Sequence, residues 1–213
     1  MILRFFAFIA ISVAIMPAIA ATTTSQALAH KQAGTPVTAD NWMISAANPL
    51  AVKAGAHILR NGGTAADAMV SVQSVLGLVE PQSYGLGGGA FLVWYDGKIG
   101  TITTLDGSET ALIAVTPQLF QDKTGTPLKF FDAVVGGLSV GTPGTPALLQ
   151  AAHERWGRSP WSSLFDDAIS LASDGFDVSA RLARLIAGDK ARLAQYQPTA
   201  DYFSAQRHPA ASR

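Results

Sequence analysis

The feature that most constrains this chain is an uninterrupted apolar run over residues 90–95, which ends in Asp96-Gly97. An Asp-Gly pair between extended segments is a strong β-hairpin signal, so we expect a second, antiparallel strand over residues 98–105. Because the first strand has no polar side, both faces of its sheet should be covered by other elements.

Two helices should precede this hairpin. Asn48 and Pro49 form a typical helix start, with Asn as the N-cap and Pro at the first helical position, and predict a helix over residues 49–60. Thr64 caps a second helix over residues 65–79. Apart from Gln73, its polar residues share one narrow stripe: Asp67, Ser71 and Ser74. The order helix, helix, antiparallel strands predicts an α+β fold and excludes a parallel doubly wound sheet.

The second half of the chain is predicted to be mostly helical. Helices should begin at Thr145-Pro146 and at Ser159-Pro160, again with a cap residue before Pro. The second of these carries an apolar face as far as Gly175, and Ser179 begins a further helix. No internal repeat interrupts this pattern.

Two glycine motifs resemble functional motifs, a dinucleotide-binding loop and a serine-esterase elbow. The elements expected on either side of each motif decide whether it is functional or only a structural turn. Residues 85–90 fit G-x-G-x-x-A, but a helix precedes them and a strand follows, the reverse of a dinucleotide site. A tight turn that passes another segment is the better interpretation. Residues 137–141 fit the G-x-S-x-G elbow of serine esterases, which makes Ser139 an alternative nucleophile, although Pro143 and Gly144 delay the helix that an elbow requires.

Composition excludes several classes of function. The 213 residues carry 15 basic and 15 acidic side chains, a formal net charge of zero, so a nucleic-acid binder is not expected. The chain has no cysteine, which excludes disulfides, thiolate metal sites and a Cys nucleophile. None of the four histidines has a metal-ligand spacing, so we expect neither a metal nor a cofactor.

The N-terminus has the pattern of a signal peptide. Arg4 precedes an apolar stretch, and cleavage is expected after Ala20, with Ala29 as the alternative. The apolar stretch is shorter than the roughly 20 residues that span a bilayer, so no stable membrane insertion is expected. We predict a signal peptide over residues 1–20, a flexible lead-in over 21–40, and a periplasmic or secreted protein.

Beyond these patterns, several long segments of the sequence resemble the N-terminal part of the γ-glutamyltransferase (glutathione hydrolase) family. The resemblance covers residues 41–203, and residues 204–213 look unlike the family. The matching segments are Asn48-Pro49-Leu50-Ala51, residues 58–68, Val79-Glu80-Pro81, and residues 85–89, 105–107, 109–111, 140–145, 160–176 and 179–182. Because these segments occur in the same order as in the family, they indicate the family far more specifically than a single glycine motif does.

The resemblance implies an N-terminal-nucleophile hydrolase fold, an αββα sandwich, of which this chain holds only the large-subunit part. Family members are made as one precursor that cuts itself at a threonine. That threonine begins the small subunit and attacks γ-glutamyl amides such as glutathione, with water or an amino acid as acceptor. The implied partners are therefore the small-subunit portion, the γ-glutamyl compound and the acceptor.

No catalytic residue is expected within this chain. The family's threonine lies downstream in a Thr-Thr-His context, whereas the threonines at 22–24 and 103–104 have no following His. We therefore expect the chain to stop before its nucleophile and to be inactive alone. A truncated record, a frameshifted gene and a true short protein are all compatible with this expectation.

One departure from the family concerns substrate binding. The family's motif after the strand is Asp-x-Arg-Glu-x-Ala-Pro, and its arginine binds the substrate's α-carboxylate. Here Ser108 stands at the arginine position, followed by Glu109, and Leu112 replaces the proline. Loss of a charge-assisted pair costs about 1.5–3 kcal/mol, or roughly 10–100-fold in binding. The alternative to a γ-glutamyltransferase is thus an acylase-like relative with a different acyl donor, or the serine esterase that would use Ser139.

Overall fold

The computed structural model describes residues 24–204. The predicted signal peptide and nearly all of the predicted tail lie outside the described residues. Of these described residues, 24–40 belong to one compact unit and 41–204 belong to a second. In the first unit, helix α1 (Thr24–Gln32) lies within the segment predicted as a lead-in. Among residues 24–204, no helix is both long enough and apolar enough to cross a membrane.

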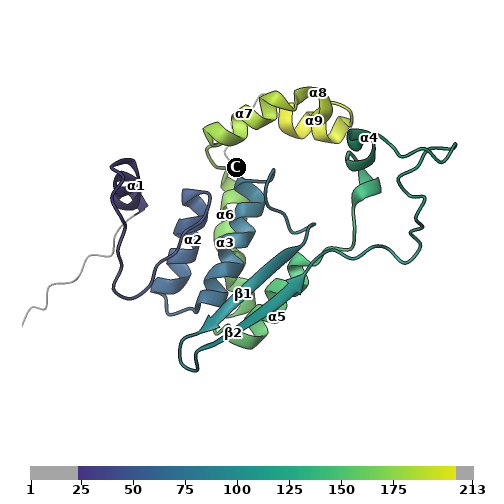
Figure 1. Cartoon of the computed structure of the whole chain (residues 1–213). Coiled ribbons are helices and arrows are strands. Elements are labelled where there is room, and N and C mark those ends of the chain that lie inside the picture. The colour runs from purple at the N-terminus through teal and green to yellow at the C-terminus, as the bar shows by residue number, and fades with distance from the viewer. Residues whose placement is uncertain (1–23, 205–213) are drawn as a thin grey trace, which may run out of the picture. The chain divides into compact units, whose positions relative to one another are not determined.

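The second unit begins with two contacting helices that match the predicted bounds, α2 (Pro49–Arg60) and α3 (Ala65–Val79) (Figure 1). Asn48 caps α2, because its side-chain Oδ1 accepts a hydrogen bond from the Leu50 amide at 2.9 Å. Thr64 and Asp67 form a capping box at α3, in which each side chain accepts a hydrogen bond from the other's backbone amide. The sequence therefore specifies both helix starts through local polar contacts.

The hairpin consists of β1 (Ala90–Asp96) and β2 (Thr101–Gly107), paired antiparallel from Ala90–Gly107 to Asp96–Thr101. The expected two-residue turn is wrong, since residues 97–100 separate the strands. Gly100 has a φ of 68° and donates its amide to the Asp96 carbonyl, a conformation that favours glycine. The Asp96 side chain accepts from the Lys98 amide at 2.9 Å and holds Lys98 in the turn.

One face of the hairpin packs on helices. Ala90, Leu92 and Leu105 contact a core that α3 and α5 (Thr145–Trp156) contribute to, and Figure 1 shows α5 beside the strands. Trp94 stacks on Trp156 with ring centroids 4.6 Å apart. The buried members of this core are Ile58, Ala68, Val70, Leu148, Leu149 and Leu164.

The other face of the hairpin is exposed. Phe91, Val93 and Tyr95 on β1 and Ile102 on β2 are 64–77% exposed. The prediction that both faces are covered is therefore wrong within the described part of the second unit, residues 41–204, which supplies helices to one side of the hairpin only. A row of large apolar side chains in water is unfavourable by about 25 cal/mol per Å².

From residue 145 onward the unit is mostly helical, as predicted. The segment between β2 and α5 carries α4 (Phe130–Val134) and the 3₁₀ turn η1 (Gly137–Ser139). After α5 follow η2 (Trp161–Phe165), α6 (Asp166–Asp174), α7 (Ala180–Gly188), α8 (Lys190–Leu193) and α9 (Gln197–Ser204). The prediction of a single helix after Pro160 is wrong in detail, because the 3₁₀ helix η2 precedes the α-helix α6. The predicted cap Ser179 is confirmed: its side chain accepts from the Leu182 amide. Helices with an antiparallel sheet confirm the α+β class.

Candidate functional site

Three loops meet at the end of the hairpin where β2 leaves the sheet. The glycine turn at residues 85–89 passes the start of α5, and the Gly88 carbonyl accepts from the Gly144 amide, the Thr145 amide and the Thr145 hydroxyl at 3.0–3.1 Å. Thr110 and Thr142 exchange both backbone hydrogen bonds at 2.9 and 3.3 Å. The interpretation of the glycine motif as a close-packed turn is confirmed.

These loops enclose a small open cleft of about 400 Å³. That volume is within the range of small-molecule sites. The lining residues are Gly87, Glu109, Thr110, Ala111, Ser139, Val140 and Gly141. The cleft thus combines backbone of two glycine-containing loops, two hydroxyl side chains and one carboxylate. We take it as the candidate site because it contains one of the two residues that the sequence placed at the substrate, Glu109.

Ser108, the other predicted substrate residue, turns toward Asp106 and does not line the cleft. Its hydroxyl donates to Asp106 Oδ1 at 2.6 Å and its amide donates to the same oxygen at 2.9 Å. These two bonds hold the pKa of Asp106 below its usual value. Because the hydroxyl proton of Ser108 is given to Asp106, Ser108 has only acceptor capacity left for a ligand.

Glu109 is held between glycines. A Cβ at Gly89 would collide with the Glu109 carboxylate and lie 2.9 Å from its backbone nitrogen, and a Cβ at Gly88 would lie 3.3 Å from Oε1. On the other side, a Cβ at Gly141 would lie 3.1 Å from the Glu109 Cβ. The glycines at these positions therefore leave the room in which the carboxylate sits at the cleft.

Ser139 does not have the environment of an esterase nucleophile. It ends the 3₁₀ turn η1, and its hydroxyl donates to the Val134 carbonyl at 2.9 Å. The described histidines bind elsewhere: His30 to Thr35, His57 to Asp167 and His153 to the Ser159 carbonyl. The strand-to-helix turn and the adjacent base that the elbow requires are thus missing from the described part of the chain.

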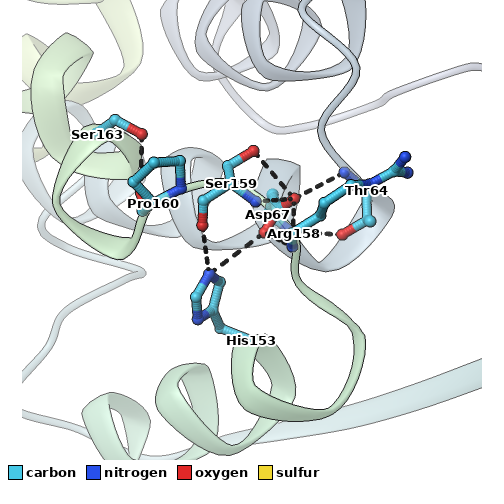
Figure 2. A network of polar contacts seen from close by, with 7 residues as sticks. All are labelled: Thr64, Asp67, His153, Arg158, Ser159, Pro160 and Ser163. Carbon is cyan, nitrogen blue, oxygen red and sulfur yellow. Dashed lines mark hydrogen bonds and ion pairs between the residues drawn. The ribbon is translucent and has the colours of Figure 1, made fainter.

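Two buried carboxylates outside the cleft are structural, and the first is Asp67 (Figure 2). Its fully buried side chain accepts from the amides of Thr64, Arg158 and Ser159 at 2.8–3.2 Å and from the Ser159 hydroxyl at 3.2 Å. His153 Nε2 lies 3.6 Å from Oδ1. Burial raises the pKa of Asp67, but these hydrogen bonds outweigh it and the pKa lies below its usual value.

The second buried carboxylate, Glu80, joins three helix ends. It accepts from Asn48 Nδ2 at 3.0 Å, Gln82 Nε2 at 2.6 Å and Arg181 Nη1 at 2.6 Å, while the Ser179 hydroxyl lies 3.4 Å away. Burial raises its pKa, but the hydrogen bonds and the Arg181 charge bring the pKa below its usual value. Glu80 therefore links the cap of α2, the end of α3 and the start of α7.

Comparison with known proteins shows the family. The family model for gamma-glutamyltranspeptidase matches residues 51–212. The chain is 38% identical over 153 residues to the glutathione hydrolase proenzyme of Bacillus subtilis, which covers 72% of this chain and 26% of that protein. It is 37% identical over 150 residues to glutathione hydrolase 3 of Arabidopsis thaliana, covering 70% and 23%.

Solved structures agree. The gamma-glutamyltranspeptidase of Helicobacter pylori superposes with a TM-score of 0.74 at 32% identity, covering 78% of this chain and 48% of that one. The chain therefore belongs to the gamma-glutamyltranspeptidase family, a family of enzymes with an N-terminal threonine nucleophile. It spans about a quarter of the length of the curated relatives that it matches.

Proposed function

We propose that this chain forms the first part of the large subunit of an enzyme that transfers or hydrolyses γ-glutamyl groups of glutathione and related amides. The family match over residues 51–212 carries this proposal. In the whole enzyme, a threonine released by self-cleavage attacks the γ-glutamyl carbonyl, with its own α-amine as the base. The acyl group then passes to water or to an acceptor amino acid.

The finer fold is also part of the proposal. An αββα sandwich has two helical layers outside two sheets, and residues 41–204 supply helices to one face of the hairpin. The exposed row of Phe91, Val93, Tyr95 and Ile102 supports a second sheet packed on the other face. We assign that sheet to the rest of the precursor, including the small-subunit portion.

The donor site is proposed at the cleft and the Asp106–Glu109 loop. The family position that holds the donor's α-carboxylate is occupied by Ser108, whose proton is already donated to Asp106. The weaker grip on a carboxylate should raise the KM for γ-glutamyl donors relative to enzymes with arginine there. This observation is also the one that favours the second candidate, an acylase-like enzyme whose donor lacks the α-carboxylate.

A hybrid protein tests the proposal. The region of the Bacillus subtilis proenzyme that this chain matches is replaced by the corresponding residues of this chain, and hydrolysis of γ-glutamyl-p-nitroanilide is followed. We expect self-cleavage into two subunits and release of p-nitroaniline, whereas the 213-residue chain alone should show no turnover. A hybrid that cleaves itself but prefers a 4-aminobutanoyl anilide, which has no carboxylate, would favour the acylase-like candidate.

Export is a separate proposal, which rests on the sequence of the N-terminus. The short positive start, the apolar stretch and the Ala18-Ile19-Ala20 cleavage pattern support a signal peptide and a periplasmic or secreted location. Mass spectrometry of the protein from the periplasm and the medium of a bacterial host should find an N-terminus at Ala21 or at His30. An intact Met1 in the cytoplasmic fraction would contradict export.

A further inference from the structure

We propose that Asn61 is a site of spontaneous deamidation, in which the backbone nitrogen of Gly62 attacks the side-chain amide of Asn61. The two residues form the turn between α2 and α3. The modification needs no reactant other than water and is independent of the proposed activity. It converts Asn61 into aspartate or isoaspartate at the end of α2.

The reaction exchanges one amide bond for another. The Gly62 amide loses its proton to hydroxide, its nitrogen forms a bond to Asn61 Cγ, and the bond from Cγ to the side-chain nitrogen breaks, which releases ammonia. Water then opens the cyclic imide at one of its two carbonyls. Opening at Cγ gives aspartate, and opening at the backbone carbonyl gives isoaspartate, in which the chain continues through the side chain.

The first argument is the residue that follows each asparagine of the chain. Asn61 is followed by a glycine, which has no Cβ to obstruct the attack. Asn48 is followed by Pro49, whose nitrogen carries no hydrogen and cannot become the nucleophile. Asn41 is followed by Trp42, which brings a bulky side chain beside the attacking nitrogen. Of these positions, Asn61 alone therefore combines a nucleophile with open access.

The second argument is the freedom of the Asn61 side chain. Asn61 and Gly62 are both exposed, and within residues 24–204 the Asn61 side chain has no hydrogen-bond partner. Asn48 differs in both respects, because it is buried and its side chain binds the Leu50 amide and Glu80. The Asn61 amide is therefore free to turn toward the nitrogen that follows it.

The third argument is the way in which α2 ends. The Gly62 amide donates to the Leu59 carbonyl at 3.2 Å, and the Gly63 amide donates to the Ile58 carbonyl at 3.0 Å. With Gly62 at a φ of 83°, these bonds form a Schellman motif. The bond of Gly62 is at the long end of the normal range, and helix ends open locally before the rest of a fold. Opening of this bond frees the Gly62 nitrogen for the reaction.

The turn has neighbours that deamidation would disturb. Thr64, the cap of α3, follows it directly, and a Cβ at Gly63 would lie 3.1 Å from the Ser159 hydroxyl, which binds Asp67. Isoaspartate adds a backbone carbon between α2 and this cap. Aspartate adds a negative charge at the negative end of the α2 dipole. The isoaspartate form should therefore be less stable than the parent chain.

Peptide mapping of the 213-residue chain tests the site. The folded chain is incubated at pH 7 and at pH 9, with a sample unfolded in urea alongside. The protease Asp-N cuts before Asp40 and Asp67, so residues 40–66 form one peptide that carries every asparagine. We expect residue 61 to gain the mass that replaces NH₂ by OH, faster at pH 9 because the Gly62 amide must lose its proton. Conversion should be slower in the folded chain than in urea, since folding binds that amide.

Asp-N also separates the two products, because it cuts before aspartate but not before isoaspartate. The aspartate product should release residues 40–60, and the isoaspartate product should remain in the intact peptide. Asn61→Gln keeps a side-chain amide but would need a larger ring, so the mass gain should disappear. Asn41→Gln should leave the conversion of residue 61 unchanged. After incubation at pH 9, the parent chain should unfold at a lower urea concentration than Asn61→Gln treated in the same way.

Two results would overturn the inference: residue 61 of the folded chain unmodified after prolonged incubation at pH 9, or Asn41 gaining mass as fast as Asn61. Equal urea midpoints for the incubated parent chain and the incubated Asn61→Gln chain would overturn the effect on stability.

Discussion

Replacing Asp67 by Asn should lower the free energy of unfolding of the second unit by more than a surface substitution does. The Asp67 carboxylate is fully buried and accepts hydrogen bonds from the amides of Thr64, Arg158 and Ser159, and from the Ser159 hydroxyl. Oδ2 takes part in bonds with all three residues, so the amide oxygen of Asn would stay there. The new NH₂ group would then replace Oδ1, where it faces the Arg158 amide and His153.

The magnitude follows from these contacts. One charge-assisted hydrogen bond is lost, at about 1.5–3 kcal/mol, and the remaining bonds become neutral and weaker. A decrease of about 2–4 kcal/mol in the free energy of unfolding is expected, a large part of the 5–15 kcal/mol typical of a domain. The pKa of Asp67 is lower in the folded than in the unfolded chain. Its stabilisation is therefore present above about pH 4 and is lost as the pH falls through the folded pKa.

Urea unfolding at pH 7, followed by tryptophan fluorescence, measures this difference. The stacked Trp94 and Trp156 report on the packing of the hairpin against α5. Asp177→Asn serves as the control, since it makes the same chemical change at an exposed position. The reasoning is refuted if Asp67→Asn lies within 0.5 kcal/mol of the parent chain, or if the gap between them fails to shrink below pH 4.

Three further predictions concern other parts of the unit. Glu80→Gln should lower the free energy of unfolding by about 1–3 kcal/mol, because Arg181 and Asn48 lose a charged acceptor. Urea unfolding measures this loss against Asp177→Asn as the control, and equal stability of the two variants would contradict it. Val93→Thr on the exposed hairpin face should reduce self-association of the chain, which we expect to be poorly soluble, and unchanged sedimentation would contradict this. The 213-residue chain should not be labelled by a fluorophosphonate probe, and labelling that disappears in Ser139→Ala would restore the esterase candidate.

Helix positions follow from local sequence, and local contacts explain why. The residues that begin α2 and α3, Asn48 and Thr64, each accept a backbone hydrogen bond within three residues of themselves. Both partners of such a capping hydrogen bond lie close together in the sequence, so the cap needs no distant residue. The hairpin turn is a different case, because Asp96 binds the Lys98 amide and shifts the turn to Gly100. An Asp-Gly pair is compatible with a two-residue turn and with this longer turn, so the pair alone does not decide the turn length.

The site was predicted less completely than the helices. The resemblance pointed to Ser108 and Glu109, and the structure brings Glu109 alone to the cleft. No spacing in the sequence predicts that Ser108 turns to Asp106, since this depends on the path of the loop. Nor does it predict that Asp67 binds the loop at residues 158–159, because that contact joins positions 91 and 92 residues apart. The capping-box spacing around Asp67 is the one local signal of that role.

The most direct test of the central claim is a gain of activity in the hybrid enzyme. If this chain supplies the donor site of a γ-glutamyl-transferring enzyme, Ser108→Arg should restore a charge-assisted contact with the donor's α-carboxylate. We predict that kcat/KM for γ-glutamyl-p-nitroanilide rises roughly 10–100-fold, mainly through KM, with no gain for the 4-aminobutanoyl anilide. An unchanged kcat/KM in a hybrid that has cleaved itself would contradict the claim.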